Sequence, residues 1–136
     1  MKVAFYKGKK RLFNKLVSWW TRGPYSHCEL VFSDGTSASS SFVDGGVRYK
    51  HILYNNDHWD FIELGQQFDE QKAREWFDAH EGCAYDVLGI AGFVVRAIGD
   101  DGHKYFCNES ILNALGISQG WRFDPNSTYA LLGGAK

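Results

Sequence analysis

The sequence has few of the residues that would mark a disulfide-rich or membrane-spanning protein. Its 136 residues contain only three cysteines and two prolines. An odd and small number of cysteines argues against a disulfide framework and favours a reducing compartment. The longest apolar segment, residues 87–98, is too short to cross a bilayer, so we expect no stable membrane insertion.

The chain also has no excess of charge of one sign. It carries 15 basic and 16 acidic residues, for a net charge of -1. Such a balance gives no general electrostatic reason to bind nucleic acid, so no nucleic-acid partner is expected. The first ten residues, MKVAFYKGKK, contain no long apolar stretch. We therefore expect no signal peptide and a cytoplasmic location, and the sequence indicates no oligomeric state.

The residues that are present are typical of one globular domain spanning residues 1–136. Hydrophobic residues make up 44% of the chain and charged residues 23%. Alternating patterns predict strands at 3–6, 27–33, 36–42, 47–52 and 59–64. Helical spacing predicts helices at 11–20, 68–80, 87–98 and 108–115, with an irregular tail from Gly120. This order predicts an α+β fold in which helices pack on an antiparallel sheet.

Cys107 is the strongest candidate for a reactive group. It lies where an extended segment meets the start of a predicted helix. The free N–H groups and the partial positive charge of a helix N-terminus favour a thiolate over a thiol. An inert buried cysteine is the alternative, since free cysteine is among the most buried residue types.

His27 opens a predicted strand in which Cys28 and Leu30 face the core. The alternation places His27 and Glu29 together on the other face. A carboxylate beside an imidazole can fix its tautomer and stabilise the imidazolium. Glu29 is therefore a candidate for a third catalytic group, with an ordinary solvent-facing strand residue as the alternative.

Ser40 is a second candidate for that role. A two-residue turn at Asp34-Gly35 would pair Ser33 with Thr36 and place Ser40 opposite Glu29. Ser40 would then share the face of His27 and could hydrogen-bond its ring.

A zinc site is the rival interpretation of the histidines and cysteines. His80 and Cys83 are three residues apart, His103 and Cys107 are four apart, and His27-Cys28 could add ligands. Structural zinc sites normally show tighter paired spacings, and the sequence has no phosphate-binding glycine loop, GxSxG or HExxH motif. We expect neither a metal nor a cofactor.

Four segments together resemble the circularly permuted branch of the NlpC-type papain-like cysteine hydrolases, a family with many small phage and bacterial members. The segments, in chain order, are Tyr25–Phe32, Asp34-Gly35, Gly82 with Tyr85-Asp86, and Tyr105–Glu109. In the permuted branch the histidine precedes the cysteine, as His27 precedes Cys107. The resemblance covers about residues 25–110.

The resemblance implies a papain-like domain with Cys107 as nucleophile and His27 as general base. Tyr105 matches a tyrosine that often lines the family's site, where its hydroxyl would help hold an oxyanion; packing in the core is the alternative. The family's usual third polar residue falls in the serine-rich stretch 37–41. Either Ser40 or Glu29 would therefore orient His27, or no residue orients it strongly.

The implied activity is hydrolysis of an amide or peptide bond through an acyl-enzyme, with peptidoglycan peptides among the family's substrates. The alternatives are a thiol acyltransferase or lipid esterase of the same fold, and a non-catalytic binding module. A phage-encoded member would act in the host cytoplasm or travel in the virion.

Overall fold

A computed structural model of the chain describes residues 1–8, 23–85 and 104–133. Five strands form an antiparallel sheet in the order β5-β1-β2-β3-β4. Their bounds are Lys2–Tyr6 for β1, His27–Val31 for β2, Ser37–Ser41 for β3, Gly46–Lys50 for β4 and Trp59–Glu63 for β5. Two short strands, β6 (Ala84–Tyr85) and β7 (Lys104–Tyr105), extend the sheet beyond β4, and these two run parallel.

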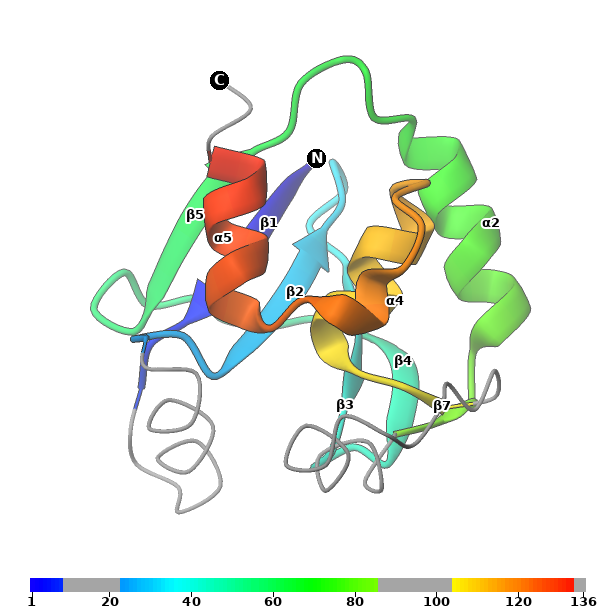
Figure 1. Cartoon of the computed structure of the whole chain (residues 1–136), viewed down its shortest axis with the longest axis horizontal. Helices are drawn as coiled ribbons and strands as arrows, with labels where there is room; N and C mark the ends of the chain where they lie inside the picture. The colour runs from blue at the N-terminus through cyan, green and yellow to red at the C-terminus, as the bar shows by residue number, and fades with distance from the viewer. Residues whose placement is uncertain (9–22, 86–103, 134–136) are drawn as a thin grey trace.

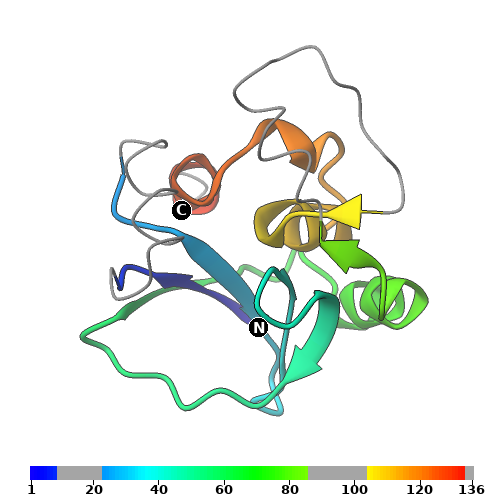
Figure 2. The same ribbon diagram turned by 90° about the horizontal axis from the view of Figure 1, so that it is seen from below.

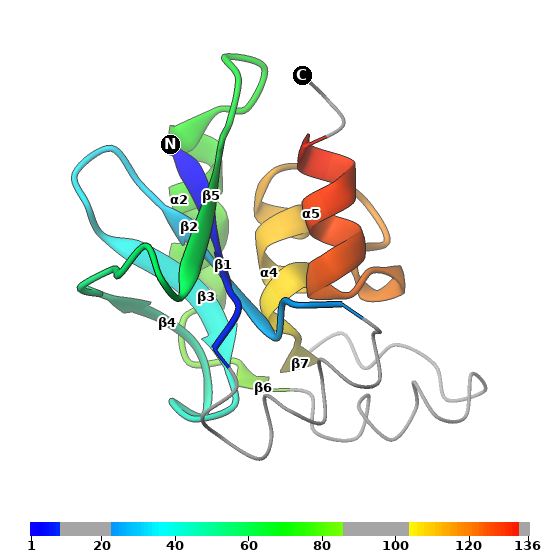
Figure 3. The same cartoon turned by 90° about the vertical axis from the view of Figure 1, so that its left-hand side faces the viewer.

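The described helices pack mainly on one side of this sheet. They are α2 (Glu70–His80), α4 (Cys107–Ala114) and α5 (Pro125–Gly133), with a 3-10 turn, η1, at Gly120–Arg122. Helix α4 contacts β2 and β3, α5 contacts β5, and α2 packs beside α4 (Figures 1 and 2). Figure 3 shows α4 and α5 side by side against the sheet. Among these helices, none has the length and apolar character needed to cross a bilayer.

Strand β2 contributes one face to the core, as its alternation predicts. Cys28 and Leu30 are fully buried and belong to the main hydrophobic cluster, together with Phe32 just beyond the strand. The opposite face of β2 is also covered, because Glu29 is only 1% exposed. Glu29 is therefore not the solvent-facing strand residue of the alternative interpretation.

The α+β class and the antiparallel sheet with helices packed on it are confirmed. Each of the five predicted strands is present with slightly different ends, and the predicted helices at 68–80 and 108–115 correspond to α2 and α4. The helices predicted at 11–20 and 87–98 lie outside the described residues.

The prediction of an irregular tail is wrong, since residues 120–133 form η1 and α5. The carboxylate of Asp124 accepts hydrogen bonds from the backbone N–H groups of Asn126 and Ser127, at 2.7 and 2.9 Å, and so caps α5. Pro125 stands at the first helical position, where its missing N–H costs nothing. This cap-and-proline pair is a helix start signal that the weak apolar periodicity of the segment obscures.

The predicted pairing of β2 with β3 is wrong by one residue. Leu30 pairs with Ala38 and Val31 with Ser37. The loop at 33–35 has three residues rather than two, because the N–H of Phe32 donates to the carbonyl of Thr36 at 2.9 Å and Gly35 adopts a left-handed φ of 85°. Continuing this register places Ser39, not Ser40, opposite Glu29.

Candidate functional site

Cys107 is the first residue of α4. Phe106 precedes it with extended backbone angles, φ -78° and ψ 164°, and caps the helix. The Glu109 carboxylate reaches back to accept a hydrogen bond from the Phe106 N–H at 3.2 Å. Cys107 therefore stands at the N-terminus of α4, the positive end of the helix dipole, as the sequence predicts.

The amide of Asn108 fastens this first turn to the segment that follows. Its Nδ2 donates to the carbonyl of Phe123 at 2.5 Å and to the carbonyl of Gly120 at 3.3 Å. Gly120 itself lies so close to α4 that an added Cβ would come within 3.1 Å of the Glu109 backbone. The start of α4 is therefore held rigidly by η1 and the chain after it.

His27 opens β2, where it pairs with Tyr6 of β1. Its Nε2 lies 2.7 Å from Oε1 of Glu29, two residues further along the strand. The His27 side chain is 21% exposed, whereas that of Glu29 is 1% exposed. The predicted contact between this imidazole and this carboxylate is present in the structure.

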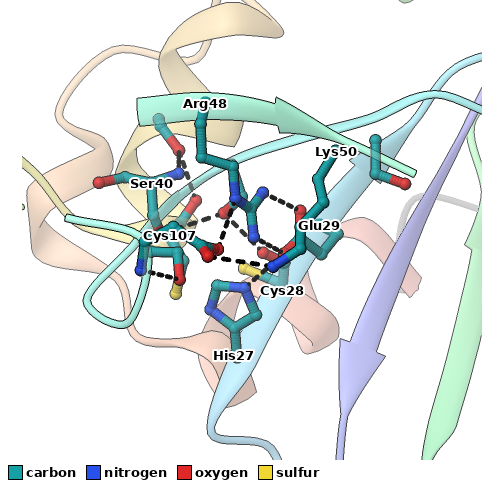
Figure 4. A network of polar contacts seen from close by, with 12 residues as sticks. His27, Cys28, Glu29, Ser40, Arg48, Lys50 and Cys107 are labelled. Atoms are coloured by element: carbon teal, nitrogen blue, oxygen red, sulfur yellow. Dashed lines mark hydrogen bonds and ion pairs between the residues drawn. The ribbon is translucent and has the colours of Figure 1, made fainter. Parts of the chain in front are cut away.

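Arg48 of β4 completes the environment of Glu29. Its Nη1 donates to Oε2 at 2.7 Å and its Nη2 donates to Oε1 at 2.6 Å, so the pair is bidentate. Figure 4 shows Glu29 between His27 and Arg48. Burial alone would raise the pKa of the Glu29 carboxyl, but the hydrogen bonds from Arg48 and the charge of His27 outweigh it and hold that pKa below its usual range.

Cys107 and Glu29 together favour a charged His27. Burial would lower the pKa of the imidazole, but the negative charges of Cys107 and then of Glu29, with a hydrogen bond to each, raise it to about 10. The histidine is thus arranged as an imidazolium between a thiolate and a carboxylate.

Cys28 is the second partner of Cys107. A hydrogen bond from Cys28 is the largest cause that lowers the pKa of the Cys107 thiol well below its ordinary value; burial opposes it, and the charge of His27 adds to it. The pKa of Cys28 itself is raised by burial and by the neighbouring Cys107. Cys28 is therefore a thiol donor to a Cys107 thiolate, and both side chains appear in Figure 4.

Ser40 does not serve the role that the predicted register gave it. Its hydroxyl donates to the carbonyl of Tyr105 at 2.5 Å, and its backbone N–H donates to Ser110 Oγ at 3.1 Å. These bonds tie β3 to the segment leading into α4, on the sheet face that α4 covers. The physical reason is the three-residue loop, which turns Ser40 away from the face of Glu29.

The ring of Tyr105 packs edge-on against two residues of α2. Its centroid lies 5.2 Å from that of Trp76 and 5.3 Å from that of His80. Its side chain is part of the core cluster. The structure therefore gives Tyr105 a packing role, with its carbonyl as the anchor for Ser40.

The ring of His80, one of the residues considered for zinc, contacts Trp76 of its own helix. His80 stacks on Trp76 with ring centroids 4.0 Å apart, and its Nδ1 lies 2.6 Å from the Trp76 carbonyl oxygen. His103 lies outside the described residues. Within residues 1–8, 23–85 and 104–133, no three His, Cys, Asp or Glu side chains gather as a metal-binding group.

A hollow in the described surface has a volume of about 670 Å³ and is separate from this site. Val31, Tyr54 and Phe61 contribute to its lining, but neither Cys107 nor His27 does.

Sequence reasoning missed two members of the site, Arg48 and the thiol of Cys28. Cys28 was considered only as a core residue and as a ligand in the zinc alternative. Arg48 pairs with Ser39 across β3 and β4, and Ser39 continues the register opposite Glu29. A correct register for both hairpins would have aligned Glu29, Ser39 and Arg48 in one row, with a short serine between two side chains of opposite charge.

In the comparisons with known proteins, no protein-family model and no curated protein matches this chain.

Proposed function

We propose that this chain is a thiol hydrolase that works through an acyl-enzyme, with Cys107 as nucleophile and His27 as proton carrier. The observation that carries the proposal is one continuous line of contacts. It runs from Arg48 through Glu29 to His27, and on to Cys107 at the first turn of α4. The papain-like, permuted NlpC-type fold belongs to the same proposal, since His27 and Cys107 occur in that order on a strand and a helix start.

The first half of the reaction uses the thiolate and imidazolium. The Cys107 thiolate attacks the carbonyl carbon of an amide, and a carbon–sulfur bond forms. The oxyanion is stabilised by backbone N–H groups at the start of α4. The carbon–nitrogen bond then breaks as His27 gives its proton to the departing amine.

The second half restores the enzyme. Neutral His27 takes a proton from a water molecule, and the resulting hydroxide attacks the thioester. The carbon–sulfur bond breaks, which releases the carboxylic acid and returns Cys107 to the thiolate and His27 to the imidazolium. Glu29 holds the ring in place and stabilises its charge throughout.

Alkylation with iodoacetamide tests the nucleophile. We expect Cys107 to react faster than Cys28 and Cys83 near neutral pH, with modification located by mass spectrometry. His27→Ala should slow the reaction, because the imidazolium no longer stabilises the thiolate. His51→Ala is the matched control, since His51 is exposed and outside the site. Equal reactivity of the three thiols would overturn the proposal.

Acyl transfer itself is tested with an activated acyl ester and a panel of cell-wall peptide amides. The expected result is a transient acyl adduct on Cys107, detected by mass spectrometry, followed by release of the acid. The adduct should be absent in Cys107→Ala. A reactive Cys107 that never forms an acyl adduct with any member of the panel would contradict the hydrolase assignment.

A further inference from the structure

Arg48 is the most heavily engaged charged residue around the site. Besides the two hydrogen bonds to Glu29, its Nε donates to Oδ2 of Asp44 at 2.8 Å. Asp44 in turn accepts from Nζ of Lys50 at 3.0 Å. The Arg48 side chain is only 15% exposed. All three groups of its guanidinium are therefore committed to carboxylates, which fixes its position.

The bidentate contact determines how the Glu29 carboxylate is turned. Arg48 Nη2 and His27 Nε2 both contact Oε1, while Arg48 Nη1 holds Oε2. Rotation of the carboxylate would break two charge-assisted hydrogen bonds at once. The oxygen that meets the histidine is therefore selected by the arginine.

We propose that Arg48 is a positioning residue of the site, which keeps Glu29 ionised and directed at His27 and thereby sets the lower pH limit for the reactive Cys107–His27 pair. This inference rests on the proposed function. Arg48 touches neither the nucleophile nor the histidine in any contact described above, so its effect passes through Glu29.

The titratable groups that interact electrostatically with Glu29 come from three parts of the chain. They are His27 and Cys28 on β2, Arg48 on β4, and Tyr54 of the loop before β5. Of these, Arg48 is the only one that is positively charged without taking part in proton transfer. It supplies the constant charge that lets a buried carboxylate stay ionised while His27 gains and loses its proton.

Removal of Arg48 should therefore convert Glu29 into a carboxyl that protonates easily. Glu29 is 1% exposed, and without the guanidinium only His27 would compensate for its burial. A protonated Glu29 no longer stabilises the imidazolium. His27 would then lose its proton at a lower pH than in the wild type. Cys107 would face a neutral imidazole, so its thiolate would form only at a higher pH.

The test is the pH dependence of iodoacetamide alkylation at Cys107 in Arg48→Met. We expect the acidic limb of the rate profile to move upward by about one pH unit or more, so that the rate on that limb falls about tenfold. Arg48→Lys, which keeps the charge but loses the bidentate geometry, should restore part of the shift. Arg74→Met is the matched control, because Arg74 pairs with Asp34 and Glu70 away from the site.

A double-mutant cycle separates positioning from a general effect on the fold. In a Glu29→Gln background, Arg48→Met should produce no further shift, because the group through which it acts has lost its charge. The same shift in both backgrounds would overturn the inference, as would an unmoved limb in Arg48→Met.

Two further measurements keep the outcomes distinct. If Arg48→Met does not fold, Asp44→Asn takes its place, since it loosens Arg48 without removing it; a small upward shift supports the inference and an unmoved limb contradicts it. If wild-type Cys107 reacts no faster than the other thiols, the proposed function fails as well. If wild-type Cys107 reacts faster than the other thiols but the Arg48 variants have the wild-type pH profile, only the role of Arg48 is contradicted.

Discussion

Replacement of Glu29 by glutamine probes the energetics of the site most sharply. The Glu29 carboxylate is almost fully buried, and it meets Nε2 of His27 at 2.7 Å and two guanidinium nitrogens of Arg48 at 2.7 and 2.6 Å. Glutamine keeps the shape of the side chain but removes its charge. Arg48 and His27 are then left partly buried with a weakened partner.

The loss in free energy of unfolding follows from the contacts that remain in Glu29→Gln. Removing one partner of a buried ion pair typically costs about 3–5 kcal/mol. Arg48 retains its bond to Asp44, and the amide oxygen of glutamine can still accept hydrogen bonds, so we expect the lower end, about 3 kcal/mol. With a urea slope of about 2 kcal/mol per molar, the unfolding midpoint should fall by about 1.5 M.

Urea unfolding followed by circular dichroism measures this loss, and Glu70→Gln supplies the comparison. Glu70 also binds an arginine, Arg74, and accepts hydrogen bonds from Ser33, but its side chain is 27% exposed. Its loss should cost less than about 1 kcal/mol. If Glu29→Gln destabilises the protein no more than Glu70→Gln does, then the buried Glu29–Arg48 pair is not the strong constraint described above.

Two further predictions concern Cys107. The pKa of His27 is raised from 6.5 to about 10, so its contribution to stability is complete below pH 6.5 and is lost as the pH rises toward 10. The pKa of Cys107 is lowered from 9.0, so its contribution is complete above pH 9.0 and is lost as the pH falls. Between pH 6.5 and 9.0 these two changes oppose each other. The difference in free energy of unfolding between wild type and Cys107→Ser should therefore be largest between about pH 6.5 and 9.0 and decline on both sides; a difference that rises or falls steadily from acid to alkaline pH would contradict the ion pair. Cys28→Ala removes a thiol donor to the Cys107 sulfur, so the pKa of Cys107, read from the pH dependence of its alkylation, should rise; an unchanged pKa would exclude Cys28 from the site.

The strands of the sheet were predictable because their alternation is local. The sequence of β2 separates Cys28 and Leu30 from His27 and Glu29 within five residues, and the glycine of the Asp34-Gly35 pair correctly indicates a turn. The contact of His27 with Glu29 needs no tertiary information, since residues i and i+2 of a strand share a face.

The rest of the site depends on register, which local pattern does not determine. A loop one residue longer than predicted moved Ser40 to the opposite face, where it bonds to the Tyr105 carbonyl. Arg48 reaches Glu29 across the intervening strand β3, so its role required two correct registers in succession. The closeness of Cys28 to Cys107 required the docking of α4 on β2, which joins residues nearly eighty positions apart.

The ultraviolet absorbance of thiolate in the native protein tests the central claim most directly. The difference spectrum between wild type and Cys107→Ala, recorded as a function of pH, isolates the ionisation of Cys107. We expect one thiolate in the wild type at neutral pH and none in the variant, because Cys28 and His27 stabilise the charge. Thiolate absorbance at Cys107 that appears only near pH 9, as for a free cysteine, would contradict it.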